Sequence, residues 1–295
     1  MKTAVFGRMS HHTDCAQVQK LVSDLKGRGV EIICYAPFAD EMARAGFPLA
    51  TPATFSDADD FPRDADLLLA LGGDGTLLTS LTFVRDSGIP VAGVNFGRLG
   101  FLTSANAGDG RLWMDDLIEG RCRTVSLMLL SLECEGAVLP FYPYAINEIS
   151  LQKQAYGMLR IEVAIDGRPL PDYWADGIIV STPAGSTAYS LSVGGPIVKP
   201  GCDVVIITPI APHNLNVRPL VVPASSTVTL RLLDGSGALV SADNRSSSVP
   251  TGTMLRIARC EKGFTTVLLS DNHFVNALRD KLLWGNDLRN KTFNR

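Results

Sequence analysis

The sequence lacks the segments that would anchor the chain in a membrane or mark it for export. Its 295 residues contain no apolar run close to the roughly 18 residues that a membrane-spanning helix needs. Residues 1–12 contain no apolar stretch of the kind found in signal peptides. Lys and Arg number 27 against 30 Asp and Glu, so no basic excess points to nucleic acid or anionic membrane as a partner. These absences predict a soluble, cytoplasmic protein.

The sequence also lacks the cysteine and histidine spacing of a zinc site or a disulfide framework. None of its six cysteines forms a CxxC pair, and none has a histidine at metal-ligand spacing. The adjacent pair His11 and His12 could touch a metal or a phosphate, or could simply lie in an exposed loop. We expect a reduced protein without structural zinc, and we assign no metal ligand to any side chain.

What is present in the first third is an alternation of strand and helix patterns. Apolar segments at residues 3–6, 30–36 and 66–71 predict strands, as does the segment 90–94. Asp14 is expected to cap a helix between the first two strands, and Pro37 to close the second strand. Leu77, Leu78, Leu81 and Val84 mark a further helix. Strand, helix, strand is typical of a parallel sheet, so we predict a Rossmann-like α/β domain over residues 1–124.

The pattern changes near residue 125, beyond which helix signals nearly vanish. Short apolar segments separated by Gly, Pro, Asp and Asn predict an all-β domain over residues 125–272. A short helical tail is expected over residues 273–295. The expected strands of the β-rich region are 127–134, 145–151, 159–165, 177–181, 204–208, 227–233, 254–259 and 265–269.

The strongest local motif is Gly72-Gly73-Asp74-Gly75-Thr76, which lies between an apolar strand and a helix. Glycines allow a backbone to approach a ligand closely, and the N-terminus of the following helix presents N–H groups that suit a phosphate. The motif is neither a GxxxxGK[ST] loop nor a GxGxxG fingerprint. A tight turn with a solvated Asp is the alternative. Three glycines around one Asp favour phosphate and hydroxyl chemistry.

Three further polar stretches follow predicted strands or interrupt them. Residues 176–190 join a buried strand to a loop of small hydroxyl side chains that contains Tyr189, whose flat ring could stack on a base or sugar. Asn147 and Glu148 interrupt the expected strand 145–151, so that one of them could face a ligand. Arg98, after the fourth strand, could meet a phosphate. The alternatives are a Ser/Thr-rich turn, an exposed edge strand and a brace within a loop.

Taken together, these stretches resemble the NAD kinase family, because they occur here in that family's order. The matching motifs are GGDGT, GxNxGRLGFL, the Asn-Glu pair and DGxxVSTPxGSTAYSLSxGGPI, and residues 209–213 and 218–222 continue the match. The resemblance implies an α/β domain, a β-sandwich-like domain and an active site between them. It implies transfer of the γ-phosphoryl group of ATP to the 2′-hydroxyl of the adenosine ribose of NAD.

Site residues are carried over from this resemblance position by position. Asp74 would be the general base, and Gly75 would lie against the ligand. Asn147 and Glu148 would hold NAD, and Asp176 would contact its nicotinamide side, in such families often from a neighbouring subunit. That arrangement implies a homo-oligomer, a dimer or a tetramer. The remaining residues carried over to the nucleotide pocket are Ala184, Thr187, Ala188, Tyr189, Ser190, Leu191, Ser192 and Arg245.

Three positions depart from the family pattern, and two other functions compete with it. Ala184 stands where the family usually has Thr, Arg245 where a Gln is expected, and Trp174 where many members carry a polar side chain. Because no basic residue lies between Asp66 and Val84, we expect magnesium arriving with ATP to neutralise most of the phosphate charge. The competing hypotheses are a lipid or sugar kinase that shares the GGDG loop, and a dinucleotide-binding regulator without turnover.

Overall fold

The computed structural model describes residues 1–10, 13–51, 53–97, 100–103, 105–107, 110–269 and 274–282. The chain divides into two compact units. None of the described helices is long and apolar enough to cross a membrane. The linear division at residues 124 and 272 stays a prediction. The first unit comprises Met1–Ser80, Ile89–Val125 and Thr266–Arg295, and the second comprises Leu81–Gly88 and Ser126–Thr265.

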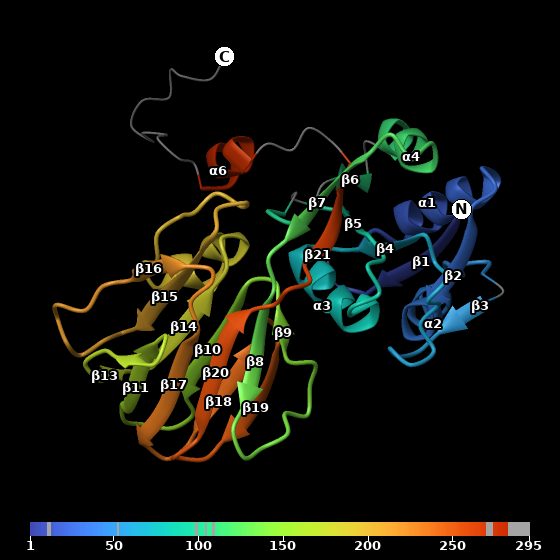
Figure 1. Cartoon of the computed structure of the whole chain (residues 1–295). Coiled ribbons are helices and arrows are strands. Elements are labelled where there is room, and N and C mark those ends of the chain that lie inside the picture. Colours follow the sequence, from blue (N-terminus) through green and yellow to red (C-terminus); the bar gives the residue numbers. More distant parts are fainter. Residues whose placement is uncertain are drawn as a thin grey trace, which may run out of the picture. The chain divides into compact units, whose positions relative to one another are not determined.

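The first unit is built on a sheet in which β3, β2, β1, β4, β5, β21 and β7 follow one another, with β6 also pairing with β5 (Figure 1). The pairs from β3 to β5 are parallel, in agreement with the predicted α/β fold. Its elements are β1 (Lys2–Gly7), α1 (Cys15–Gly27), β2 (Glu31–Tyr35), α2 (Ala36–Arg44), β3 (Ala53–Phe55), β4 (Leu67–Leu71), α3 (Asp74–Val84), β5 (Val91–Asn95), β6 (Ala105–Asn106), α4 (Gly110–Ile118), β7 (Arg123–Leu127), β21 (Phe264–Leu268) and α6 (Phe274–Leu282).

The two faces of this sheet are covered by different helices. Alternate strand residues such as Val5, Leu69 and Val94 belong to one apolar cluster with buried side chains of α1, α2 and α4. On the other face, a Cβ at Gly93 would overlap the side chain of Leu77 in α3, so glycine lets this helix pack closely. Burial on both faces explains why β4 reads as an uninterrupted apolar run.

The order of the strands places the GGDGT motif at a specific point in the sheet. From β1 the chain moves outward through β2 to β3, and then returns to the opposite side of β1 as β4. The carboxyl ends of β1 and β4 therefore flank a topological switch point, where open parallel sheets bind their ligands. The loop that follows Leu71 begins at this point.

The second unit consists mainly of two antiparallel sheets whose buried side chains form a single apolar cluster (Figure 1). This agrees with the predicted β-sandwich-like fold. One sheet has the order β16-β15-β14-β10-β18-β19, and the other runs β12-β11-β17-β20-β8-β9, with β13 on β11. The elements are β8 (Leu130–Cys134), β9 (Tyr144–Ala145), β10 (Glu148–Lys153), β11 (Leu159–Ile165), β12 (Arg168–Pro169), β13 (Tyr173–Ala175), β14 (Gly177–Ser181), η2 (Ala184–Thr187), α5 (Tyr189–Ser192), β15 (Val204–Ile210), β16 (Leu220–Pro223), β17 (Val228–Asp234), β18 (Ala238–Ala242), β19 (Arg245–Val249) and β20 (Met254–Arg259).

Several local expectations were wrong, each for a recognisable reason. Pro37 does not close a strand but lies in the first turn of α2, where its missing N–H costs nothing. The expected strand 127–134 is two strands, β7 and β8, in different sheets. The last strand of the β-rich region, β21, pairs in parallel with β5 of the first unit. The helix expected in the tail is present as α6.

Candidate functional site

The GGDGT loop turns sharply between β4 and α3. Gly72 adopts a φ of 152°, and a Cβ there would overlap the hydroxyl of Thr76, so this position requires glycine. Asp74 is the first residue of α3 and lies at the positive end of the helix dipole. Gly75 has open space where a side chain would begin, since apart from its chain neighbours and the backbone of its own helix no described atom lies within 4 Å of its ideal Cβ position.

The carboxylate of Asp74 is held by the segment that follows β5. Its Oδ1 accepts hydrogen bonds from Leu102 N, Thr103 N and Thr103 Oγ1, at 3.1, 3.0 and 3.2 Å. Its Oδ2 accepts one from Phe101 N at 2.7 Å. A Cβ at Gly100 would overlap Oδ1, so the second glycine of the GRLGF stretch permits this approach. The carboxylate is therefore fixed in orientation.

In the second unit, Asn147 and Glu148 lie where the strand path breaks between β9 and β10. The expected continuous strand over 145–151 was wrong, and so was the alternative of an exposed edge, because β10 pairs with β14 and β18 on its two sides. Asn147 Oδ1 and Glu148 Oε2 are both buried and have no hydrogen-bond partner among the residues that the structure describes. Buried polar atoms without partners are rare and costly, which makes them typical of ligand-binding groups.

Glu148 is also electrostatically unusual. Burial raises the pKa of its carboxyl from 4.5 to about 8, and the neighbouring Asp243 adds to the rise. The backbone N–H of Tyr189 donates to this carboxylate and opposes the shift. A carboxyl in such a place can change its charge near neutral pH.

The loop after β14 is bound tightly to the Asn147 segment. Thr182 N donates to Asn147 O at 2.9 Å, and Thr182 Oγ1 donates to Ile146 O at 2.7 Å. A Cβ at Gly185 would overlap the backbone of Asn147, so this glycine is required for the close approach. The hydroxyl of Tyr189 lies 3.3 Å from Gln152 Oε1. The structure thus brings two of the predicted stretches, Asn147-Glu148 and 182–190, into one site.

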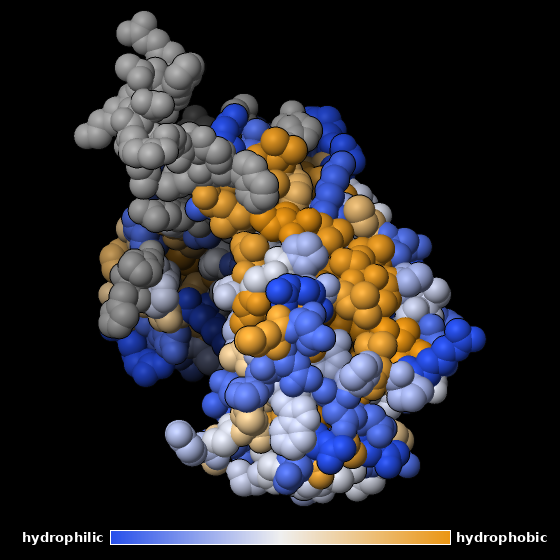
Figure 2. All heavy atoms as spheres, turned by 90° about the vertical axis from the view of Figure 1, so that its left-hand side faces the viewer, coloured by the Kyte–Doolittle hydropathy of each residue, from blue (hydrophilic) through white to orange (hydrophobic). Residues whose placement is uncertain are grey.

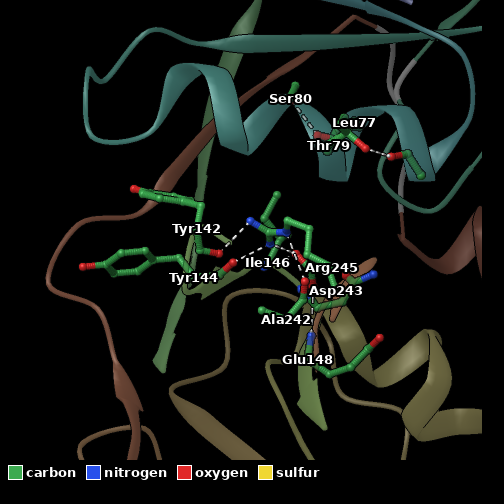
Figure 3. A network of polar contacts seen from close by, with 12 residues as sticks. Leu77, Thr79, Ser80, Tyr142, Tyr144, Ile146, Glu148, Ala242, Asp243 and Arg245 are labelled. Carbon is green, nitrogen blue, oxygen red and sulfur yellow. Dashed lines mark hydrogen bonds and ion pairs between the residues drawn. The ribbon is translucent and has the colours of Figure 1, made fainter. Parts of the chain in front are cut away.

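The turn between β18 and β19 supports the same segment from the other side (Figure 3). Asp243, whose side chain is 0% exposed, accepts hydrogen bonds from the backbone N–H groups of Ile146, Asn147 and Glu148 at 2.9, 2.8 and 3.2 Å. Arg245 Nη2 lies 3.5 Å from Asp243 Oδ2. Asp243 therefore fixes the backbone that carries the two side chains with an unpartnered oxygen.

Arg245 also donates hydrogen bonds to three backbone carbonyls. Nη1 donates to Tyr142 O at 2.9 Å, Nη2 to Tyr144 O at 2.6 Å, and Nε to Ala242 O at 3.1 Å (Figure 3). Five donors in a fixed planar fork suit such a role, which a glutamine could fill only in part. In this structure Arg245 joins the 142–144 segment to the β18–β19 turn.

The remaining predicted residues lie in the segment after β14, except Asp176, which directly precedes that strand. Asp176 pairs with Lys153 at 2.7 Å and is only partly exposed. Ala184 is buried in η2, where its carbonyl accepts the Thr187 hydroxyl at 3.3 Å. Ser190 is buried and shares a hydrogen bond with Thr208. Ala188 and Leu191 are half-buried, and Ser192 is exposed. The suggested roles of Arg98, His11 and His12 fall outside the described residues.

Several residues that hold the site are not among those predicted from the sequence. The backbone donors of residues 101 and 102 end the GxNxGRLGFL motif and Thr103 follows it, but nothing in the sequence indicates that they bind Asp74. Asp243 is not among the predicted site residues, although an Asp directly after an apolar strand is a signal for a turn. Among the described residues, no group of three or more His, Cys, Asp or Glu side chains could hold a metal ion.

Two features are typical of a nucleotide-binding protein. The α/β unit has a fixed carboxylate at its switch point, and the β-rich unit has unpartnered buried polar groups beside a tyrosine. Models of the ATP-NAD kinase N-terminal and C-terminal domains match residues 11–122 and 146–269. The chain belongs to the ATP-NAD kinase family, so the expected resemblance is confirmed.

The similar proteins cover nearly the whole chain. An NAD kinase of Flavobacterium psychrophilum is 37% identical over 294 residues, which cover 98% of this chain and 100% of the relative. One from Cytophaga hutchinsonii is 37% identical over 97% and 99%. Among solved structures, yeast NADH kinase complexed with NADH has a TM-score of 0.88 at 24% identity, covering 98% of this chain and 89% of that one. An Archaeoglobus fulgidus NAD kinase in complex with ATP has a TM-score of 0.72 at 24% identity, over 94% and 97%. The lipid or sugar kinase and the regulator receive no support from these matches.

Proposed function

We propose that the chain transfers the γ-phosphoryl group of ATP to the 2′-hydroxyl of the adenosine ribose of NAD, which makes NADP. The observation that carries the proposal is the Asp74 carboxylate, held by four donors at the switch point of the α/β unit of a family member. Phosphoryl transfer asks a protein mainly for positioning and charge stabilisation, and a fixed carboxylate suits the first of these needs.

Asp74 is the general base in this proposal. Its Oδ1 already accepts three hydrogen bonds, whereas Oδ2 accepts one, so Oδ2 has room for the hydroxyl of a substrate. Asp74 orients the 2′-hydroxyl and takes its proton late, as the loose transition state forms. The bond from the ribose oxygen to Pγ forms while the bond from Pγ to the β–γ bridging oxygen breaks. ADP leaves, and the proton passes from Asp74 to solvent.

The second unit supplies most of the residues that bind NAD in this proposal. Asn147 Oδ1 and Glu148 Oε2 are buried acceptors that would gain partners from the ligand's hydroxyl or amino groups. Tyr189 and the loop around it supply a flat ring and small hydroxyls, and Asp176 contacts the nicotinamide side. The residues proposed to line the nucleotide pocket are Ala184, Thr187, Ala188, Tyr189, Ser190, Leu191 and Ser192. Arg245 contributes through Asp243 rather than by direct contact, since its donors bind carbonyls.

Magnesium belongs to the donor in this proposal. The described residues offer no cluster of three metal-binding side chains. A divalent ion that keeps several waters and binds mainly through substrate phosphates does not require such a cluster. We therefore propose MgATP as the substrate form, and activity should be lost in excess chelator.

We further propose a homo-oligomer, a dimer or a tetramer, that works in the cytoplasm. One face of the protein carries extensive apolar surface (Figure 2). The second unit exposes Trp174 of β13 and Leu220 and Val221 of β16. Clusters of exposed apolar side chains often mark protein interfaces. All six cysteines are free thiols, as expected in a reducing compartment. Trp174→Glu should lower the oligomeric state in sedimentation velocity.

The experiment that tests the proposed reaction follows the phosphoryl group itself. The purified protein is incubated with NAD, magnesium and ATP labelled in the γ-phosphate, and the product is assayed with an NADP-specific dehydrogenase. Label in NADP, in a one-to-one ratio with ADP, is the expected result. Label released only as inorganic phosphate, or ATP and NAD binding without transfer, would contradict the proposal.

A further inference from the structure

The GGDGT loop lacks a side-chain cation of its own. No Lys, Arg or His lies between Asp66 and Val84. Transfer of a phosphoryl group develops negative charge that enzymes stabilise with metal ions, backbone N–H groups and cationic side chains. A lysine that acts as a point charge on a nucleotide's phosphates is a recurrent solution. A cationic side chain near Asp74 therefore has to come from elsewhere in the sequence.

The C-terminal helix α6 supplies one. Lys281 Nζ lies 4.5 Å from the centroid of the Phe101 ring, a cation–π distance. The backbone N–H of the same Phe101 donates to Asp74 Oδ2. Lys281 is thus joined to Asp74 through one shared residue, although about 200 positions separate them in the sequence. All three residues belong to the first unit.

The surroundings of this ammonium group differ from those of the lysines that form ion pairs. Lys281 is half-buried, and within the described part of the chain its Nζ has no hydrogen bond and no ion pair. Lys2, Lys153 and Lys262 by contrast each have a carboxylate at 2.6 to 3.1 Å. Burial lowers the pKa of Lys281, while the negative charge of Asp74 raises it. A partly desolvated ammonium group without a hydrogen bond is costly, unless an anionic ligand completes its surroundings.

We propose that Lys281 binds the terminal phosphate of the donor nucleotide, so that α6 forms part of the MgATP site. The inference rests on the proposed function and names the residue that supplies the missing cation. The ring of Phe101 holds the ammonium beside the segment that fixes Asp74. One short segment, 100–103, then positions both the carboxylate that takes the proton and the cation that binds the phosphate.

Three variants test the proposal in the full-length protein. Lys281→Met removes the charge and keeps much of the length, Lys281→Arg keeps the charge, and Arg279→Met removes a cation from an exposed position of the same helix. Lys281→Met should raise the KM for MgATP by about 10- to 100-fold, the loss expected when a charged hydrogen bond disappears. The KM for NAD should stay within about twofold, Lys281→Arg should recover most of the loss, and Arg279→Met should resemble wild type.

A direct titration separates this inference from the proposed function. Calorimetry with MgATP, and with magnesium tripolyphosphate as a probe without a base or sugar, should give weaker binding for Lys281→Met by the same factor for both ligands. Equal affinities of wild type and Lys281→Met would overturn the inference even if NADP is made. So would a shift of the pH profile of kcat with the KM for MgATP unchanged, since Lys281 would then act through Asp74. If wild type makes no NADP, the proposed reaction fails, and the titration still decides the role of Lys281.

Discussion

The two units hold their key carboxylates in opposite ways. In the first, Asp74 accepts four hydrogen bonds from residues 101–103. In the second, Glu148 Oε2 has no partner within the described part of the chain, and burial raises the pKa of Glu148 to about 8. A carboxylate with many donors is held in one orientation, whereas one with an unsatisfied oxygen is ready to gain a partner. This difference suits Asp74 to the proposed proton transfer and Glu148 to the proposed recognition of a ligand.

The largest expected effect comes from replacing the fixed carboxylate. Asp74→Asn removes the base and turns an NH2 group toward donors, so NADP formation should fall by about 10²- to 10⁴-fold, the usual contribution of a general base. The rate is measured at saturating NAD and MgATP, and thermal unfolding serves as a check on the fold. Thr103→Ala is the control, since it removes only one of the four donors. Near-normal turnover of Asp74→Asn would remove Asp74 from this role.

The glycine next to this carboxylate allows a second test of whether its fixed position matters. A Cβ at Gly100 would overlap Asp74 Oδ1, so Gly100→Ala should displace the carboxylate and lower kcat by about tenfold or more. Gly97→Ala is the matched control in the same stretch, because its Cβ would lie 3.8 Å from Asn95 Oδ1, an ordinary contact. Equal kcat values for the two variants would show that the position of Asp74 does not matter.

Loss of the Asp243–Arg245 pair, which supports the segment that carries Glu148, should lower the free energy of unfolding. Arg245→Met leaves Asp243 as a buried charge without its cation, and removal of one partner of a buried pair costs about 3–5 kcal/mol of unfolding free energy. Arg256→Met, which breaks an exposed pair with Glu133, should cost about 0–1 kcal/mol. Chemical denaturation of both variants measures the difference. A loss of similar size in the two would mean that the Asp243–Arg245 pair is not a buried support.

A further expected effect is a dependence of stability on pH. Because the pKa of Glu148 is raised from 4.5 to about 8 on folding, the folded chain binds more protons than the unfolded chain between these values. The contribution of Glu148 is fully present below 4.5 and is lost as the pH rises through about 8. Glu148→Gln should flatten the melting temperature over this range. An unchanged slope in the variant would contradict the raised pKa.

The local parts of the fold and site could be predicted from the sequence, because they depend on neighbouring residues. The apolar run of β4, the glycines after it and the start of α3 are contiguous, and Asp14 caps α1 by binding Gln17 N, as expected. The strands β11, β14 and β20 have the predicted bounds because turn residues enclose their apolar segments.

The missing parts depend on tertiary contacts across long stretches of sequence. Asp74 binds backbone N–H groups 27 to 29 positions away, which carry no side-chain signal. Asp243 lies 95 to 97 positions from the backbone N–H groups whose hydrogen bonds it accepts. In the sequence, Lys281 is one cation of an amphipathic helix, and only the packing of α6 shows that it lies near Phe101. The break at Asn147 was missed because apolar residues flank it on both sides, as in a continuous strand.

One measurement tests the division of roles most directly, namely calorimetric titration of NAD into Asp74→Asn and Asn147→Ala, alongside their turnover rates. Asp74→Asn should bind NAD within a few-fold of wild type and lose turnover. Asn147→Ala should bind NAD about tenfold more weakly or worse, because a buried acceptor and its ligand partner both lose their bond, while turnover at saturation falls far less. The reverse pattern, with NAD affinity lost in Asp74→Asn and kept in Asn147→Ala, would contradict the account.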